Sequence, residues 1–98
     1  MCYCYIIHSE YLDRFYIGAT SLALEERLEH HLLKYYSDVK FTAKAKDWIL
    51  FLAIPCSSFD QARKIEFHIK SMKSKHYIIN LKIYPEILQK LMELYPDS

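Results

Sequence analysis

Two short runs of aromatic and β-branched residues near the amino terminus limit the folds open to this 98-residue chain. Residues 1–8 and 15–19 each have the composition of a strand, and residues 9–14 between them are polar enough to form a turn. Strands this close in sequence pair as an antiparallel hairpin. The fold must therefore be built around an amino-terminal β-hairpin.

The register of this hairpin follows from its symmetry. A hairpin that is symmetric about residues 11–12 places Tyr5 opposite Gly18. The same register places Ile7 opposite Tyr16, with all these side chains on one face of the sheet. Gly18 is the only glycine in the chain. Opposite Tyr5, it leaves a space in which a phenol hydroxyl can meet a substrate.

The rest of the chain shows helical periodicity with one further strand. Leucines recur at every fourth position after residue 20, Ser58 and Gln61 fit a capping box, Ser74 can cap a further short helix, and Pro85 suits the first turn of the last one. The helix that begins at Ser58 has one apolar stripe, made of Phe59, Ala62, Ile65, Ile69 and Met72. An apolar run that Pro55 ends predicts the strand. In chain order the predicted elements are strands 1–8 and 15–19, a helix from residue 20 or 21 to about residue 35, a strand 48–54, and helices 58–72, 74–81 and 85–95. This order, ββαβααα, predicts the α+β class, with a small three-stranded antiparallel sheet flanked by helices.

The composition favours a single compact domain over residues 1–98. Apolar residues make up 52% of the chain, and one glycine and three prolines argue against long flexible linkers. The three cysteines form no C-x-x-C pair, so neither a disulfide framework nor a zinc site is expected. No stretch has the roughly 20 apolar residues of a membrane span, and we expect a cytoplasmic protein with reduced thiols.

The formal net charge of +1 hides an uneven distribution of charge along the chain. Residues 34–82 carry ten Lys or Arg against four Asp or Glu, whereas the segments before and after them are net negative. A segment this basic can contact a phosphate backbone. An ordinary solvated surface with uneven charge explains the same counts, so composition alone does not assign a partner.

The two predicted strands also carry a paired motif. Residues 3–5 are Tyr-Cys-Tyr and residues 16–18 are Tyr-Ile-Gly, with ten residues between the two triplets. The pair resembles the two triplets for which the GIY-YIG nucleases are named. The second triplet matches in full, and Gly18 is its glycine. The first triplet keeps only its last residue, Tyr5, which is the position that carries chemistry in that family.

The resemblance extends to about residue 82 and implies the remaining residues of a site. Arg27 and His31 are similar to the Arg and His that the family places on its first helix, where a spacing of four puts both on one face. Glu66 matches the metal-binding carboxylate of the family. Residues 73–81 resemble the tail of a compact subfamily whose members are single domains.

These matches imply a metal-dependent endonuclease that hydrolyses phosphodiester bonds, with DNA as the expected nucleic acid. In this interpretation Glu66 binds one Mg²⁺ or Mn²⁺. Tyr5 is the general base or orients the water, and Arg27 stabilises negative charge on the phosphate oxygens. Tyr16 and His31 complete the site. We expect the two phenols, the guanidinium and the carboxylate to converge on one shallow concave surface.

Lysines of the basic segment are the expected contacts to the nucleic-acid backbone. Those of the loop 40–46 and the turn 73–75 should border the site and bind phosphate without reading bases. Lys34 lies one helical turn beyond His31, and some family members carry an asparagine at a distance past the glutamate comparable to that of Asn80. The expected nucleic-acid-binding residues are Lys34, Lys40, Lys44, Lys46, Lys73, Lys75 and Asn80.

Each proposed site residue also has a purely structural explanation. The two tyrosines can be ordinary strand aromatics, the Arg-His pair an exposed helix face, and Lys34 a solvated side chain. Glu66 lies beside an apolar helical stripe, where a carboxylate is costly unless it is paired or binds a metal. A salt bridge to Arg27 or Lys70 is the structural explanation for it.

Two other functions therefore compete with the nuclease. One is a catalytically inactive module of the same fold that binds nucleic acid, and the other is an unrelated scaffold protein whose match to the motif is accidental. Suitable side chains at all five proposed catalytic positions argue against a degenerate site. The choice between DNA and RNA, the preferred substrate structure and the oligomeric state stay open.

Overall fold

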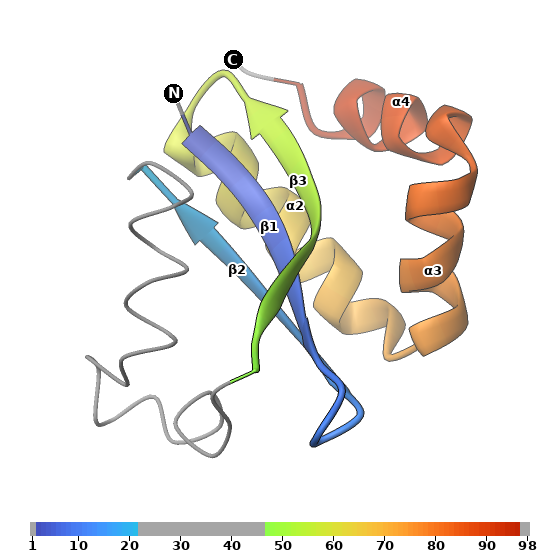
Figure 1. Ribbon diagram of the computed structural model, residues 1–98. Helices are drawn as coiled ribbons and strands as arrows, with labels where there is room; N and C mark the ends of the chain where they lie inside the picture. Colours follow the sequence, from blue (N-terminus) through green and yellow to red (C-terminus); the bar gives the residue numbers. More distant parts are fainter. Residues whose placement is uncertain (1, 22–46, 97–98) are drawn as a thin grey trace.

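The computed structural model describes residues 2–21 and 47–96. In this part of the chain a three-stranded antiparallel sheet packs against helices (Figure 1). Labelled as in Figure 1, the elements are β1 Cys2–Ser9, β2 Arg14–Thr20, β3 Ile49–Cys56, α2 Phe59–Met72, α3 Lys75–Ile83 and α4 Pro85–Leu94. The predicted α+β class and the order of these six elements are confirmed, and the helix predicted over about 20–35 lies outside the described residues.

β1 and β2 form the predicted hairpin in the predicted register. Tyr5 pairs with Gly18, and Ile7 pairs with Tyr16. The two strands extend further toward the turn than expected, so the turn contains only residues 10–13. Symmetry alone was sufficient to predict the register because no bulge interrupts this pair of strands.

β1 is the central strand of the sheet, and β2 and β3 are its two edges. The pairing of β1 with β3 shifts between Ile6 and Ile7, which marks a local irregularity. Pro55 was expected to end the third strand but lies inside it, opposite Tyr3. An edge strand tolerates proline because one of its sides has no hydrogen-bonding ladder to complete.

The main core lies between one face of the sheet and the helices. Its buried members are Cys4, Ile6, Ile17, Ile54, Cys56, Ala62, Ile65, Ile69, Ile78, Leu81 and Leu91. Phe59 and Met72 were expected on the same stripe of α2 but are 42% and 44% exposed. They are the first and last residues of α2, where a helix extends past the surface that it covers.

Serine side chains begin two of the helices as predicted. The Oγ atom of Ser58 accepts the N–H of Gln61 at 3.1 Å at the start of α2. The Oγ atom of Ser74 accepts the N–H of Tyr77 at 3.1 Å at the start of α3. These bonds satisfy amide groups that the helices leave without internal partners. None of the helices described by the structure is long and apolar enough to cross a lipid bilayer.

A second, smaller cluster lies on the other face of the sheet. It consists of buried Tyr5, Ile7 and Trp48, with Leu12 and Tyr16 packed against them. Successive strand residues point to opposite faces, so this cluster and the main core lie on opposite sides of the hairpin. The motif tyrosines therefore face away from α2.

Candidate active site

The ring of Tyr5 lies against the backbone of Gly18. A β-carbon added to Gly18 would stand 2.6 Å from Cζ and 3.0 Å from Cε1 of Tyr5, and closer still to its hydroxyl oxygen. The space left by the glycine is thus filled by the phenol itself, which is only 2% exposed. Because Gly18 belongs to the edge strand β2, it allows the ring of Tyr5 to extend toward the edge of the sheet.

Tyr16 belongs to the same edge strand and is half-buried. It packs against the small cluster that contains Tyr5, on the face away from α2. The Nζ atom of Lys70, a residue of α2, nevertheless lies 5.9 Å from the centroid of the Tyr16 ring. The Lys70 side chain must therefore reach round the β2 edge, where the two faces of the sheet meet.

Glu66 lies at the rim of the main core, as the sequence predicted, and its side chain is 15% exposed. Its Oε2 atom accepts a hydrogen bond from Nζ of Lys70 at 2.6 Å. Its Oε1 atom is 3.6 Å from Nε of Arg63, which is longer than a hydrogen bond. The salt bridge to Lys70 considered from the sequence is therefore present, whereas Arg27 lies outside the described residues.

The proposed catalytic residues come from both sides of the sheet. Tyr5 and Tyr16 lie on the face away from α2. Glu66 belongs to α2, whose buried residues pack with Cys4 against the opposite face. Burial raises the pKa of the Cys4 thiol, and the negative charge of Glu66 raises it further. The described residues therefore do not form the single concave face that was expected. A shared site has to lie round the β2 edge, where Lys70 approaches both Glu66 and Tyr16.

Several predicted site residues lie outside the part of the chain that the structure describes. They are Arg27, His31, Lys34, Lys40, Lys44 and Lys46. Their roles in catalysis and in binding nucleic acid stay predictions.

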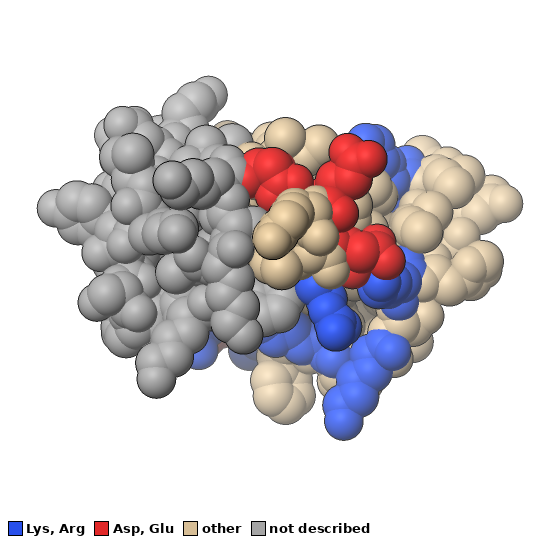
Figure 2. All heavy atoms as spheres, turned by 60° about the horizontal axis from the view of Figure 1, so that its bottom comes forward, with Lys and Arg blue, Asp and Glu red and all other residues tan. Residues whose placement is uncertain are grey.

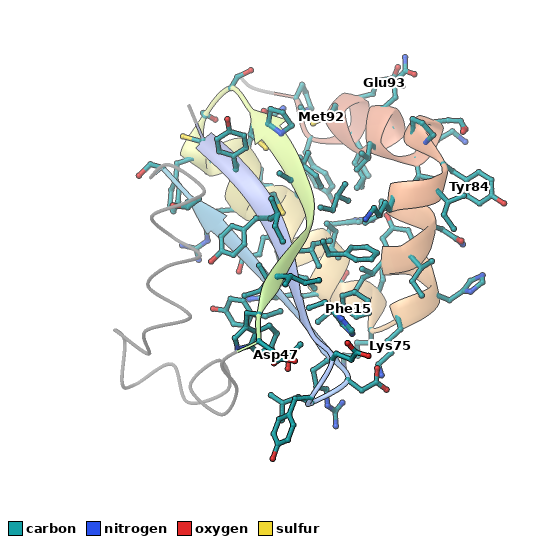
Figure 3. All side chains as sticks on the ribbon, viewed as in Figure 1. Phe15, Asp47, Lys75, Tyr84, Met92 and Glu93 are labelled. Carbon is teal, nitrogen blue, oxygen red and sulfur yellow. The ribbon has the colours of Figure 1, made fainter. Side chains whose placement is uncertain are left out.

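The described residues predicted to bind nucleic acid have different surroundings. Lys73 is exposed at the carboxyl end of α2, with a left-handed φ of 49°. Lys75 lies beside the hairpin turn (Figure 3), where its Nζ donates to the carbonyl of Asp13 at 2.9 Å and to its Oδ2 at 3.2 Å. The carbonyl of Asn80 accepts the N–H of Tyr84 at 2.8 Å. Lys75 thus ties α3 to the hairpin, a structural role that its sequence position did not reveal.

Acidic and basic side chains occupy separate areas of the face that carries the turn between β1 and β2. Figure 2 shows acidic side chains gathered in one patch, with most of the Lys and Arg side chains below it and others to its right. Glu10 and Asp13 belong to the turn itself. Asp47 is bound to it, accepting from the Oγ of Ser9 at 2.6 Å and from the N–H of Tyr11 at 2.9 Å. A phosphate backbone is repelled by the acidic patch and attracted to the basic side.

Glu66 is the carboxylate of this site that could bind a divalent metal ion. Within residues 2–21 and 47–96, no three His, Cys, Asp or Glu side chains are grouped to hold one. Mg²⁺ keeps several waters and needs only one or two protein carboxylates. The Glu66 carboxylate supplies the oxygen donors that such an ion prefers, and its partner Lys70 is exposed enough to move aside. The donor chemistry of Glu66 therefore fits a largely hydrated Mg²⁺ or Mn²⁺.

Comparison with protein families finds a match to the GIY-YIG catalytic domain over residues 1–78. The match covers more than half of the chain, and the chain belongs to the GIY-YIG family. The domains of this family are those of endonucleases that act on nucleic acid, and they generally use divalent metal ions. Comparisons with curated proteins and with solved structures gave no match. Family membership removes the accidental motif match from the competing explanations.

Lys70 is the member of this site that the sequence indicated only as a salt-bridge partner. Its spacing of four from Glu66 puts the two side chains on one helix face, and this signal was present in the sequence. Its approach to Tyr16 was not predictable, because helical periodicity does not say along which strand a helix packs.

Proposed function

We propose that this protein is a metal-dependent endonuclease that hydrolyses phosphodiester bonds of nucleic acid, with DNA as its substrate. One observation carries the proposal. Tyr16 of the edge strand and Glu66 of α2 approach the same ammonium group of Lys70 round the β2 edge. The Tyr5 ring crosses Gly18 toward that edge. Membership of the GIY-YIG family supports a hydrolytic role for this arrangement.

Hydrolysis of a phosphodiester requires a positioned water, an acceptor for its proton, and positive charge near the phosphate oxygens. We assign the first two tasks to Tyr5, whose phenol would orient the water or take its proton. Its ring is fixed by burial and by contact with Gly18, so little ordering remains for the reaction itself. Tyr16 would hold the water or a phosphate oxygen through its own hydroxyl.

Positive charge is assigned to a divalent ion and to an arginine. Glu66 would hold Mg²⁺ or Mn²⁺ through its carboxylate oxygens. When bound, the ion supplies positive charge to the phosphate oxygens. Arg27 would offer its planar fork of donors to the same oxygens, and His31 would complete the site. These two assignments follow from the family resemblance.

The nucleic-acid backbone is proposed to lie along the basic side of the molecule. Lys73 is exposed at the end of α2, and we assign it a contact to phosphate together with Lys34, Asn80 and the lysines of the loop 40–46. Lys75 is held by Asp13 and contributes mainly long-range positive charge. Such contacts bind nucleic acid of any sequence.

A catalytically inactive module that binds nucleic acid is the second candidate. Two observations favour it: the phenol of Tyr5 is almost fully buried, and Glu66 already has a cationic partner in Lys70. Such a module binds nucleic acid with an affinity that falls steeply as the salt concentration rises. It does not cleave nucleic acid in the presence of any divalent metal ion.

A substrate panel distinguishes the two candidates. The purified full-length chain is incubated with duplex, branched and single-stranded DNA and with RNA, in Mg²⁺, in Mn²⁺ and in chelator. We expect cleavage of DNA only in the presence of metal, and loss of cleavage in Tyr5→Phe, which removes one hydroxyl. Salt-sensitive binding without cleavage on every substrate would establish the inactive module instead.

A further inference from the structure

We propose that the side chain of Lys70 changes partner during the reaction. In the metal-free protein its ammonium group neutralises Glu66, and when a divalent ion occupies that carboxylate the ammonium turns to a phosphate of the substrate. The inference rests on the proposed function, because it takes Glu66 as the metal ligand. It goes beyond that function by giving Lys70 a role in each state of the site.

The geometry supports two alternative partners for one ammonium group. Nζ of Lys70 is 2.6 Å from Oε2 of Glu66, which is a short charge-assisted hydrogen bond. The same atom lies 5.9 Å from the centroid of the Tyr16 ring. Among the contacts of the described residues, this lysine links the α2 side of the site to the motif strand.

Because the Glu66 side chain is mostly buried, its carboxylate needs a cationic partner both with and without a bound metal ion. Its side chain is 15% exposed at the rim of the core, and a carboxylate in such a position is costly without a positive partner. The attraction between a Glu and a Lys four residues apart on a helix is weak where the pair meets solvent, and the lysine side chain is flexible. The side chain of Lys70 is 49% exposed, so a divalent ion can displace it without disturbing the core.

Displacement of Lys70 from Glu66 by a divalent ion changes the charge that the site presents to a phosphate. Glu66 and Lys70 together carry no net charge, so without the ion this pair adds little attraction for a phosphate. Once the divalent ion has neutralised the carboxylate, the ammonium group is released within reach of the β2 edge, where Tyr16 lies. The site then carries net positive charge when a phosphodiester has to be bound and cleaved.

The same helix contains a matched control pair. Lys64 bonds to Asp60 at 3.0 Å with the same spacing of four residues. The Lys64 side chain is 50% exposed, nearly the same as that of Lys70. Asp60 is 73% exposed and does not lie at the rim of the core. Replacing Lys64 therefore removes an equivalent surface charge without touching the proposed site.

The test measures Mn²⁺ binding and DNA cleavage for the full-length protein and its Lys70→Met, Lys70→Arg, Lys64→Met and Glu66→Gln variants. Calorimetry or the electron paramagnetic resonance of free Mn²⁺ gives the affinity without any cleavage. Removal of the competing ammonium should raise the Mn²⁺ affinity of Lys70→Met by about 2- to 10-fold. At saturating Mn²⁺ the same variant should lose about 10-fold or more in kcat. Lys70→Arg should recover part of that loss, and Lys64→Met should resemble wild type in both measurements.

The possible failures point to different assignments. An unchanged or lower Mn²⁺ affinity in Lys70→Met, with binding still dependent on Glu66, overturns the partner change and leaves the nuclease proposal intact. Tighter Mn²⁺ binding with unchanged kcat removes the phosphate role of Lys70. If Glu66→Gln binds Mn²⁺ as tightly as wild type, Glu66 is not the metal ligand and the proposed function fails at that residue. Melting curves for each variant identify any loss of fold.

Discussion

The phenol ring of Tyr5 occupies the position where a side chain at Gly18 would lie. A β-carbon there would be 2.6 Å from Cζ of Tyr5, a separation far shorter than van der Waals contact. The single glycine of the chain is therefore required by the packing of one particular tyrosine. The two residues lie directly opposite each other in the hairpin, so the two halves of the motif act as one unit.

Replacement of Gly18 by alanine should destabilise the fold and stop cleavage. Tyr5 is 2% exposed and has little room to move, so we expect a loss of about 1–3 kcal/mol, the usual cost of overpacking. Urea unfolding measures this loss. In a Tyr5→Leu background the atoms that clash are gone, and the same substitution should cost much less. An equal cost in both backgrounds would show that the Tyr5 ring does not set the requirement for glycine.

Replacement of Glu66 by glutamine should leave the metal-free fold nearly unchanged. Its partners Lys70 and Arg63 have side chains that are 49% and 64% exposed, so they stay hydrated when the carboxylate charge is removed. We expect a change within about 1 kcal/mol of wild type. Mg²⁺ should raise the melting temperature of wild type but not of the variant. A variant that is clearly less stable yet still cuts would assign Glu66 to a structural salt bridge.

Loss of charge at Lys73, which precedes α3, and at Lys75, the first residue of α3, should have different effects on DNA binding and stability. Lys73→Gln should lower the slope of log affinity for DNA against log salt by about 1, because it removes one phosphate contact. Lys75→Gln should lower the melting temperature, because Lys75 ties the hairpin turn to α3 through Asp13. DNA titrations at several salt concentrations, with melts of both variants, check this contrast. A normal melting temperature for Lys75→Gln, with a reduced salt slope, would make Lys75 a phosphate contact instead.

Stability should fall at alkaline pH. Burial raises the pKa of Cys4 and Cys56 above the ordinary thiol value of 9.0, and that of Tyr77 above 10.0. The folded state keeps these protons to a higher pH than the unfolded chain does. Their contribution is therefore fully present below about pH 9 and is lost as the pH rises through the raised values. Urea unfolding at pH 7 and pH 10 measures the loss, which Cys4→Ala should reduce. Equal stability at both pH values would contradict the assignment.

Local rules predicted the parts of the fold that depend on neighbouring residues. Hairpin symmetry gave the pairing of Tyr5 with Gly18, and serine caps gave the starts of α2 and α3. The rim position of Glu66 followed from the apolar stripe of its helix. Each of these features is decided within one strand pair or one helical turn, so one sequence is enough to predict it.

The arrangement of the site depends on packing between elements, which the sequence did not reveal. Periodicity identified the buried stripe of α2, but not the face of the sheet that it covers. The tyrosines and Glu66 were therefore expected on one surface, whereas Tyr5 lies on the face away from α2, the helix that carries Glu66. For the same reason the contact of Lys75 with Asp13, across 62 residues of sequence, was not foreseen.

The most direct test of the account is the initial rate at which the purified protein nicks supercoiled DNA in Mn²⁺. Wild type, Glu66→Gln and Asp60→Asn are compared, since Asp60 is an exposed carboxylate of the same helix that is paired with Lys64. We predict metal-dependent nicking by wild type, an unchanged rate for Asp60→Asn, and a loss of about 100-fold or more for Glu66→Gln. Nicking by wild type in chelator, or by Glu66→Gln at the wild-type rate, would contradict the account.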